Sequence, residues 1–198
     1  MATLMELLRR PGIALAEVTA HLDNLNHPER VAQAVALCKA EQMTLWEIAA
    51  NSKPLTFEYL LPRDAASLVP YPFEGKNSLP LFTRFQKVFY LDRKRNLCGY
   101  NNQAMMRFTG PGYYMVQMNP KAAGEIQVDY TRLPDEHPEG WPEIESNMKI
   151  RSRFIYGGTK DNLRWVSKDV VIGRAFKMGE RPMPNWFILC RQEPAPEP

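Results

Sequence analysis

The apolar residues of this chain change their spacing near residue 87, and that change limits the folds the chain can adopt. Upstream, apolar residues such as Ile13, Val18 and Leu22 recur roughly at the spacing of a helix face. Downstream, apolar and polar residues alternate over short segments that end in turn residues, as at Gly110-Pro111-Gly112. No helix is predicted between these segments, so the pattern favours an antiparallel sandwich or barrel over a parallel sheet.

The alternating part of the chain predicts a series of short strands. The stretch 79–90 before them fits a short helix as well as the start of a strand. Both faces of the last strand are apolar, with Trp186, Ile188 and Cys190 opposite Phe187 and Leu189. We therefore expect that strand to pack between the barrel core and the N-terminal helices. The predicted strands are 87–91, 96–101, 104–109, 112–118, 124–131, 149–156, 162–167, 169–177 and 185–191.

The first 53 residues predict three helices. An apolar run from Leu4 is broken at Pro11-Gly12, and a second helix starts where Asn26 can cap it ahead of a proline. A third helix is expected to start at Thr44, with Glu47 completing a capping box. Of the 17 prolines in the chain, five lie in residues 54–80, which predicts an irregular connection there.

We therefore predict an α+β fold, with N-terminal helices followed by an antiparallel, lipocalin-like β-barrel or strongly curved sheet. The chain divides into a helical segment (1–53), a proline-rich connector (54–80), a barrel domain (81–192) and a disordered tail (193–198). The tail is assigned because its alternating prolines can hold neither a strand nor a helix. The helices are expected to cover one end or an outer face of the barrel.

Charge and hydropathy exclude several classes of partner. The formal net charge is +3, which is too small for a dedicated nucleic-acid binder. No apolar run is long enough for a transmembrane helix, so we expect no membrane partner. The charge is uneven, because residues 132–148 carry one basic and five acidic side chains and residues 149–198 carry ten basic and five acidic ones.

Residue spacing points to neither a metal nor a cofactor. The three histidines lie far apart, without the ligand spacing of a structural zinc site. Gly75-Lys76-Asn77 lacks the upstream glycine and the hydroxyl residue of a phosphate-binding loop. Three cysteines, an odd number, fit a reducing cytoplasm. An exposed sheet edge would allow a homodimer.

The layout of residues 75–191 resembles that of uncharacterised proteins named for a GXWXG motif, which are similar to lipocalin-type barrels. The resemblance rests on the apolar segment 79–89, on the short basic hairpin after it, and on the closing aromatic strand 186–191. The GXWXG motif itself does not occur in this chain. The resemblance implies a barrel and a small apolar ligand, and it carries over no catalytic residue.

Methionines and aromatic residues gather on consecutive predicted strands. Methionine suits cavities for flexible apolar molecules, and a small barrel can enclose one ligand. We therefore predict that the protein binds a small, largely apolar molecule inside the barrel, where a few polar groups orient it. The predicted ligand-binding residues are Asn101, Met106, Phe108, Tyr113, Gln117, Tyr130, Ser152 and Tyr156.

Two other functions stay open at this point. A cyclase- or isomerase-type enzyme could use the same cavity with a single acid or base, for which Asp129 and Tyr130 are the first candidates. Alternatively, the chain is a protein–protein interaction module that docks through its helical segment or through the acidic loop 134–145. In that loop an exposed Trp141 would be the anchor.

Overall fold

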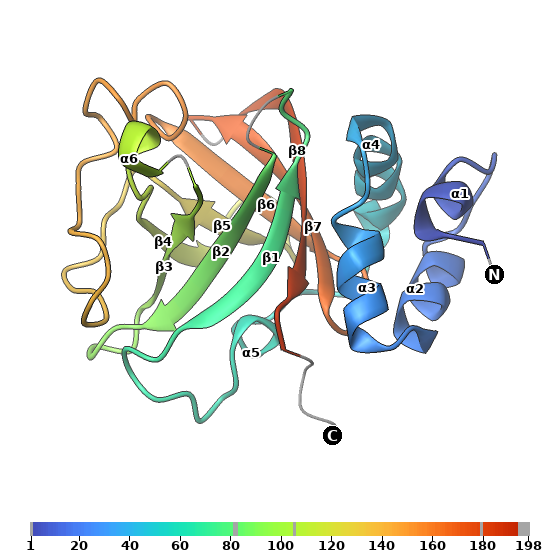
Figure 1. The fold of residues 1–198 in the computed structure, drawn as a ribbon, viewed down its shortest axis with the longest axis horizontal. Helices are drawn as coiled ribbons and strands as arrows, with labels where there is room; N and C mark the ends of the chain where they lie inside the picture. The colour runs from blue at the N-terminus through green and yellow to red at the C-terminus, as the bar shows by residue number, and fades with distance from the viewer. Residues whose placement is uncertain (1, 81–82, 105, 179, 194–198) are drawn as a thin grey trace.

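The chain forms a closed eight-stranded antiparallel barrel with a helical layer on one side (Figure 1). The computed structural model describes residues 2–80, 83–104, 106–178 and 180–193. Each strand pairs with the next along the chain, and β8 returns to pair with β1, so no edge is left open. The strands are β1 (Tyr71–Asn77), β2 (Arg84–Leu91), β3 (Leu97–Asn102), β4 (Tyr114–Met118), β5 (Ile126–Asp129), β6 (Thr159–Trp165), β7 (Val170–Lys177) and β8 (Arg181–Arg191).

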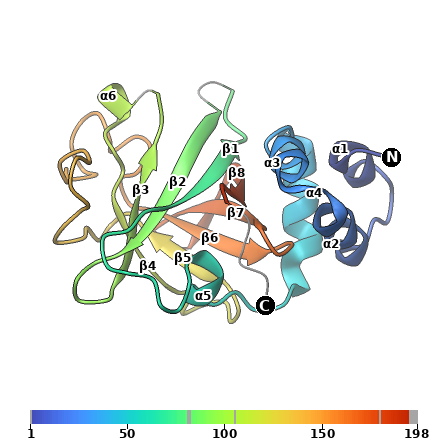
Figure 2. The same cartoon turned by 60° about the horizontal axis from the view of Figure 1, so that its bottom comes forward.

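The N-terminal helices cover the outer face of β7 and β8, where α3 and α4 contact the strands and α1 packs on the other helices (Figures 1 and 2). They are α1 (Leu4–Leu8), α2 (Leu15–Asn24), α3 (His27–Ala34) and α4 (Lys39–Ile48), followed by the 3₁₀ turn η1 (Ala49–Asn51). Trp186, Ile188 and Cys190 are buried against these helices, while Phe187 and Leu189 face the barrel interior. The prediction that β8 is covered on both faces is confirmed.

The described residues before 54 form four helices and a 3₁₀ turn, where three helices were predicted, and their boundaries also differ. Asn26 caps α3 as expected, accepting a hydrogen bond from the backbone N–H of Glu29 at 2.9 Å. The start at Thr44 is wrong, because Thr44 lies inside α4. That helix begins after Cys38, whose backbone N–H donates to Glu41 at 3.1 Å. Glu41 therefore has the capping-box role that was predicted for Glu47. Sequence did not indicate this helix start, because cysteine is not a preferred N-cap residue.

Two predicted strands and part of the connector are also corrected. Segment 104–109 contains a short helix, α6 (Met106–Thr109), and segment 149–156 consists of turns. The proline-rich range 54–80 contains a short helix, α5 (Phe57–Leu60), and all of β1, so the barrel begins at Tyr71. β1 contains one proline, Pro72, which is tolerated because it lies near the start of the strand. The tail residues 194–198 lie outside the described residues.

The two ends of the barrel are filled differently. The end beneath α5, here called the closed end, is packed with apolar side chains such as Phe73, Phe89 and Leu163, and connector residues Leu55 and Leu60 cover it. The opposite end, near α6, is here called the open end.

Among the described residues, no helix combines the length and apolar character needed to cross a bilayer.

Candidate functional site

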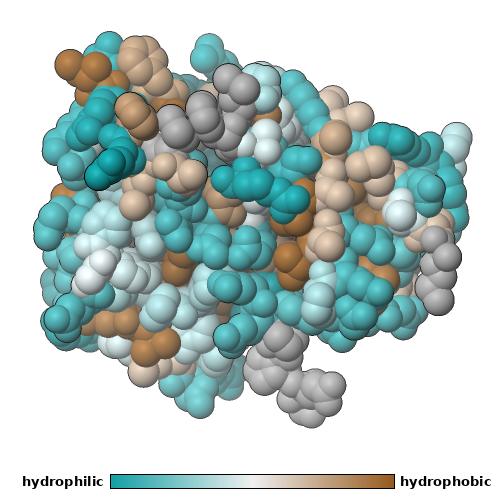
Figure 3. Space-filling view, viewed as in Figure 1, coloured by the Kyte–Doolittle hydropathy of each residue, from teal (hydrophilic) through white to brown (hydrophobic). Residues whose placement is uncertain are grey.

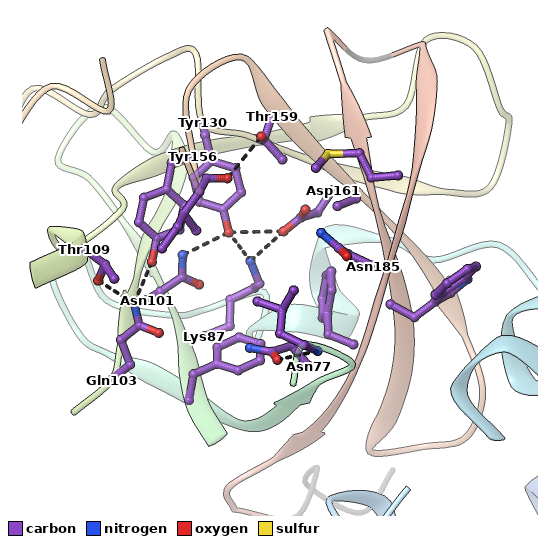
Figure 4. A pocket seen from close by; sticks show the side chains of 17 residues that line it. Asn77, Lys87, Asn101, Gln103, Thr109, Tyr130, Tyr156, Thr159, Asp161 and Asn185 are labelled. Carbon is purple, nitrogen blue, oxygen red and sulfur yellow. Dashed lines mark hydrogen bonds and ion pairs between the residues drawn. The ribbon is translucent and has the colours of Figure 1, made fainter. Parts of the chain in front are cut away.

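A cavity of about 160 Å³ lies inside the barrel at the open end (Figure 4). Its walls are mainly apolar and include Phe85, Phe187, Ile155 and Ala175. Its inner surface carries polar side chains that reach it from β2, β3 and β6 and from the residue after β5. The cavity therefore combines an apolar wall with a polar floor, as small-molecule sites commonly do.

Two of the wall aromatics lie across glycines of the neighbouring strand. Phe187 pairs with Gly173 across the β7–β8 ladder, and a Cβ built on that glycine would come within 2.1 Å of the ring. Phe85 pairs with Gly75 across β1 and β2, where the same approach is 2.8 Å. Each glycine therefore lets the opposite ring lie flat along the wall instead of filling the cavity.

The floor is built around a buried cluster of Lys87, Tyr130 and Asp161. The Lys87 ammonium donates hydrogen bonds to the Tyr130 hydroxyl at 2.7 Å and to Asp161 Oδ2 at 3.1 Å. The Tyr130 hydroxyl donates to the same carboxylate oxygen at 3.1 Å (Figure 4). The Lys87 ammonium also lies 4.7 Å from the ring centre of Tyr114, where the aromatic face favours a cation.

Strand register brings these three side chains together. Lys87 lies two residues from Phe89 on β2, and Asp161 lies two residues from Leu163 on β6, so both point inward with those core residues. Tyr130 follows Val128 in the same way at the end of β5. The inner rows of these strands thus change from apolar at the closed end to polar at the open end.

Burial perturbs the ionisation of the cluster. It lowers the pKa of Lys87, although the neighbouring Asp161 carboxylate opposes this change. It raises the pKa of Asp161, although Lys87 and the Tyr130 hydroxyl oppose that change. Both changes favour the neutral forms, because the low-dielectric interior disfavours charge. A buried ion pair of this kind is weak evidence for stability and marks a candidate functional site.

Asn101 leaves one polar atom without a partner in the floor. Its side chain is 3% exposed, and its amide N–H groups donate to the Tyr130 hydroxyl at 2.9 Å and to the Gly112 carbonyl at 3.4 Å. Among the described residues, nothing donates to its Oδ1 atom, which is also buried. A buried acceptor without a donor costs free energy, so this atom is available to a donor from a ligand or water.

Tyr156 forms a second layer beside Tyr130. The two rings stack with their centres 5.0 Å apart, and the Tyr156 hydroxyl accepts a hydrogen bond from the Gln103 amide at 2.9 Å. Burial raises the pKa of Tyr156 to about 12, so this hydroxyl keeps its proton at neutral pH. Tyr156 thus adds a neutral polar group to a mainly aromatic surface.

The structure brings three of the eight predicted ligand-binding residues to the cavity, namely Asn101, Tyr130 and Tyr156. Met106 and Tyr113 belong instead to a small cluster on the outer face of β2 and β3. Phe108, Gln117 and Ser152 do not line this cavity either: Phe108 is two-thirds exposed, Gln117 bonds with Gln127, and Ser152 is buried beside Gly110.

Of the two residues suggested for acid–base chemistry, one lines the cavity and the other does not. Tyr130 lies in the cavity floor, whereas Asp129 does not line the cavity and pairs with Lys160 at 2.7 Å. Alternation explains the difference, because consecutive strand residues point to opposite faces.

Sequence reasoning missed the charged pair Lys87–Asp161. The signal was present in the alternation itself, since Phe85, Lys87 and Phe89 share a row in which the lysine alone is charged. Asp161 escaped notice because the predicted strand starts only at residue 162, whereas β6 already begins at Thr159. A single charge within an apolar strand face is the pattern to look for.

The acidic loop 134–145 is folded against the barrel. Its Trp141 is only partly exposed, because its ring lies 4.4 Å from that of Tyr100 and 5.3 Å from that of Tyr90. Asp135 pairs with Lys94 at 2.8 Å and Glu136 with Arg93 at 2.6 Å, so two carboxylates of the acidic loop pair with the basic β2–β3 hairpin. The expected exposed aromatic anchor is therefore not found at Trp141.

Burial disfavours a catalytic role for two of the three cysteines. Cys98 and Cys190 are buried, and burial raises the pKa of each thiol to about 12, which opposes thiolate formation. Within the described part of the chain, no cluster of three metal-ligating side chains occurs.

No protein-family model, no curated protein and no solved structure matches this chain.

Proposed function

We propose that the protein binds a small, largely apolar molecule in the cavity at the open end of the barrel. One observation carries this proposal: a cavity with apolar walls encloses a buried acceptor, Asn101 Oδ1, that no described residue satisfies. A core that served stability alone would fill this space with apolar side chains, as the closed end does.

The size of the cavity limits the ligand. A cavity of about 160 Å³ is close to the apolar cavity of roughly 150 Å³ that holds benzene in an engineered protein. The enclosed part of the ligand is therefore about one six-membered ring in size. Any larger part would extend past Ile155, which is 40% exposed at the cavity entrance.

The floor specifies the polar part of the ligand. Asn101 Oδ1 accepts a hydrogen bond, so the ligand carries at least one O–H or N–H group. The Tyr130 hydroxyl accepts from Lys87 and from Asn101 and donates to Asp161, so its bonding capacity is used within the protein. We therefore infer a ring-sized apolar molecule with a hydrogen-bond donor, such as a phenol or a cyclic alcohol.

Native mass spectrometry tests this proposal. The full chain, purified from its own source, is expected to carry a small molecule that denaturing extraction releases and identifies. Ala175 lies opposite Asp161 in the β6–β7 ladder, so Ala175→Phe places a ring in the cavity beside the polar floor, and that variant is expected to be purified empty. Ala104→Phe, at an exposed position outside the cavity, is the matched control and is expected to keep the ligand. Wild-type protein that carries nothing, or equal occupancy in Ala175→Phe, would refute the proposal.

A second candidate function is supported by the Lys87–Asp161 pair. Opposed pKa changes in a buried pair ease the transfer of a proton, which is what an isomerase or cyclase requires of its acid–base groups. In this candidate, Asp161 takes a proton from the bound molecule and returns it at another atom. If the extracted compound exchanges a C–H proton for deuterium in heavy water with wild type but not with Asp161→Asn, the enzymatic function is favoured. If wild type catalyses no exchange, the enzymatic function is rejected and binding remains as the candidate function.

A further inference from the structure

The open end of the barrel carries a group of exposed apolar side chains that the cavity does not use. We define this group as the mouth rim, consisting of Phe108, Met148, Ile150, Phe154 and Met178. Each of these side chains is between 66% and 76% exposed. Exposed apolar side chains gathered at one place mark an interaction surface more often than scattered single ones do.

Contacts between the segments hold the mouth rim together on one end of the molecule. The Arg151 side chain donates to the Arg107 carbonyl at 3.0 Å, which links the loop at 148–158 to α6. The backbone N–H of Met178 donates to the Gly158 carbonyl at 2.7 Å, which links that loop to the β7–β8 turn. Met148, Phe154 and Met178 line one hollow of about 500 Å³. Figure 3 shows apolar and hydrophilic residues interspersed over this end of the barrel, at the upper left.

Basic residues flank the mouth rim in the sequence and in space. Residues 106–109, 148–158 and 177–182 contain six basic side chains and one acidic one, Glu180. That glutamate forms an ion pair with Lys121. Within the described residues, Arg107, Arg153 and Arg181 lie in no ion pair. The six basic residues are Arg107, Lys149, Arg151, Arg153, Lys177 and Arg181.

This combination fits an anionic lipid surface better than a protein. The core of a protein–protein interface is depleted in charge, whereas here a basic residue adjoins almost every apolar side chain. Lys149 and Arg151 pair with Glu145. A second copy of the chain would still bring three unpaired arginines against the same three, and the like charges would repel. Apolar side chains that enter the headgroup region beside cations that bind lipid phosphates are typical of proteins that lie on a membrane surface.

We propose that the mouth rim docks the open end of the barrel onto an anionic membrane surface. This interaction is peripheral, so the absence of a long apolar run in the sequence does not bear on it. Ile155 follows the mouth-rim residue Phe154 and lines the cavity, so the docked barrel directs its entrance toward the lipid. The proposal is independent of which molecule the cavity holds.

Co-sedimentation of the full chain with vesicles tests the proposal. The protein is expected to bind phosphatidylcholine vesicles that contain phosphatidylserine, to bind pure phosphatidylcholine vesicles much more weakly, and to dissociate as salt is raised. Ile150→Asp/Phe154→Asp is expected to lower the partition coefficient at least about ten-fold, because two apolar side chains no longer enter the lipid. Arg107→Gln and Arg153→Gln are each expected to lower it about five-fold.

Met43→Asp on α4 is the matched control, since Met43 is also exposed but lies outside the mouth rim. It is expected to bind as wild type does, and circular dichroism verifies that all variants are folded. No binding of wild type to either vesicle overturns the proposal, as does equal binding of Ile150→Asp/Phe154→Asp. Light scattering tests for a dimer. The proposal is also overturned if wild type binds no vesicles and forms a dimer that the double variant dissociates.

Discussion

The closed and open ends of the barrel are built from the same strands, yet different kinds of side chain fill them. At the closed end, Phe89 on β2 and Leu163 on β6 are fully buried in an apolar core. Two residues away on the same inner rows, Lys87 and Asp161 form a buried ion pair beside a cavity. The comparison teaches that one end stabilises the fold, while the other retains polar groups and empty space that stability does not require.

The largest expected effect comes from truncating the closed end. Phe89→Ala should lower the free energy of unfolding by about 3–5 kcal/mol, because a fully buried ring is lost and leaves a cavity. Phe85→Ala, on the same strand but half-buried at the open end, should cost less than half as much. Urea denaturation measures both variants. Equal losses would mean that the two ends contribute alike to stability.

The buried ion pair gives the next largest effect. Lys87→Met should lower the free energy of unfolding by about 3 kcal/mol, because it leaves the Asp161 carboxylate buried without its partner. The double variant Lys87→Met/Asp161→Leu should recover most of this loss, since a buried pair replaced by apolar residues is often neutral or stabilising. Denaturation of the single and double variants measures the coupling. A double variant as unstable as the single one would show that the pair supports the fold.

The raised pKa of Asp161 predicts how stability depends on pH. Folded protein keeps this proton to a higher pH than unfolded protein does, so the free energy of unfolding should fall as pH rises above 3.8 and through the folded-state pKa. Carboxyl carbon NMR follows the titration of Asp161 directly. The fall should be missing in Lys87→Met/Asp161→Leu, and an Asp161 that titrates below 3.8 would contradict the description of the floor.

The smallest effect on stability is expected at the mouth rim. Phe154→Ser should change the free energy of unfolding by no more than about 0.5 kcal/mol, because this side chain is 75% exposed and leaves little buried area on removal. A thermal melt measures the change. A much larger loss would indicate that the mouth rim packs as a core and is not a free surface.

The same comparison explains what the sequence could reveal. Alternation identified β2 and the later strands β5 to β8, including both covered faces of β8, because there one face meets a core and the pattern follows burial. It did not identify β1, which lies in the predicted proline-rich connector. Alternation failed at 149–156, where Ile150 and Phe154 repeat at strand spacing but face solvent in turns. An apolar residue retained for a surface cannot be distinguished by spacing from one retained for a core.

The candidate site was only partly predictable for a related reason. Asn101, Tyr130 and Tyr156 were recognised as polar groups among aromatic ones, whereas Lys87 and Asp161 resemble ordinary surface charges when each is considered alone. Their role depends on the ion pair between the Lys87 and Asp161 side chains. β2 and β6 are not neighbours in the sheet, and the closed barrel brings these side chains together across its interior. Strand order sets that contact, and strand order does not follow from the spacing of residues within one strand.

Calorimetric titration with phenol and toluene tests the central claim most directly. The two probes have nearly the same size and shape, but only phenol offers an O–H group to Asn101 Oδ1. We predict that wild-type protein binds both probes, that it binds phenol about five-fold more tightly, and that Ala175→Phe binds neither. Wild-type protein that binds neither probe, or Ala175→Phe that binds both as wild type does, would contradict a ligand-binding cavity at the open end.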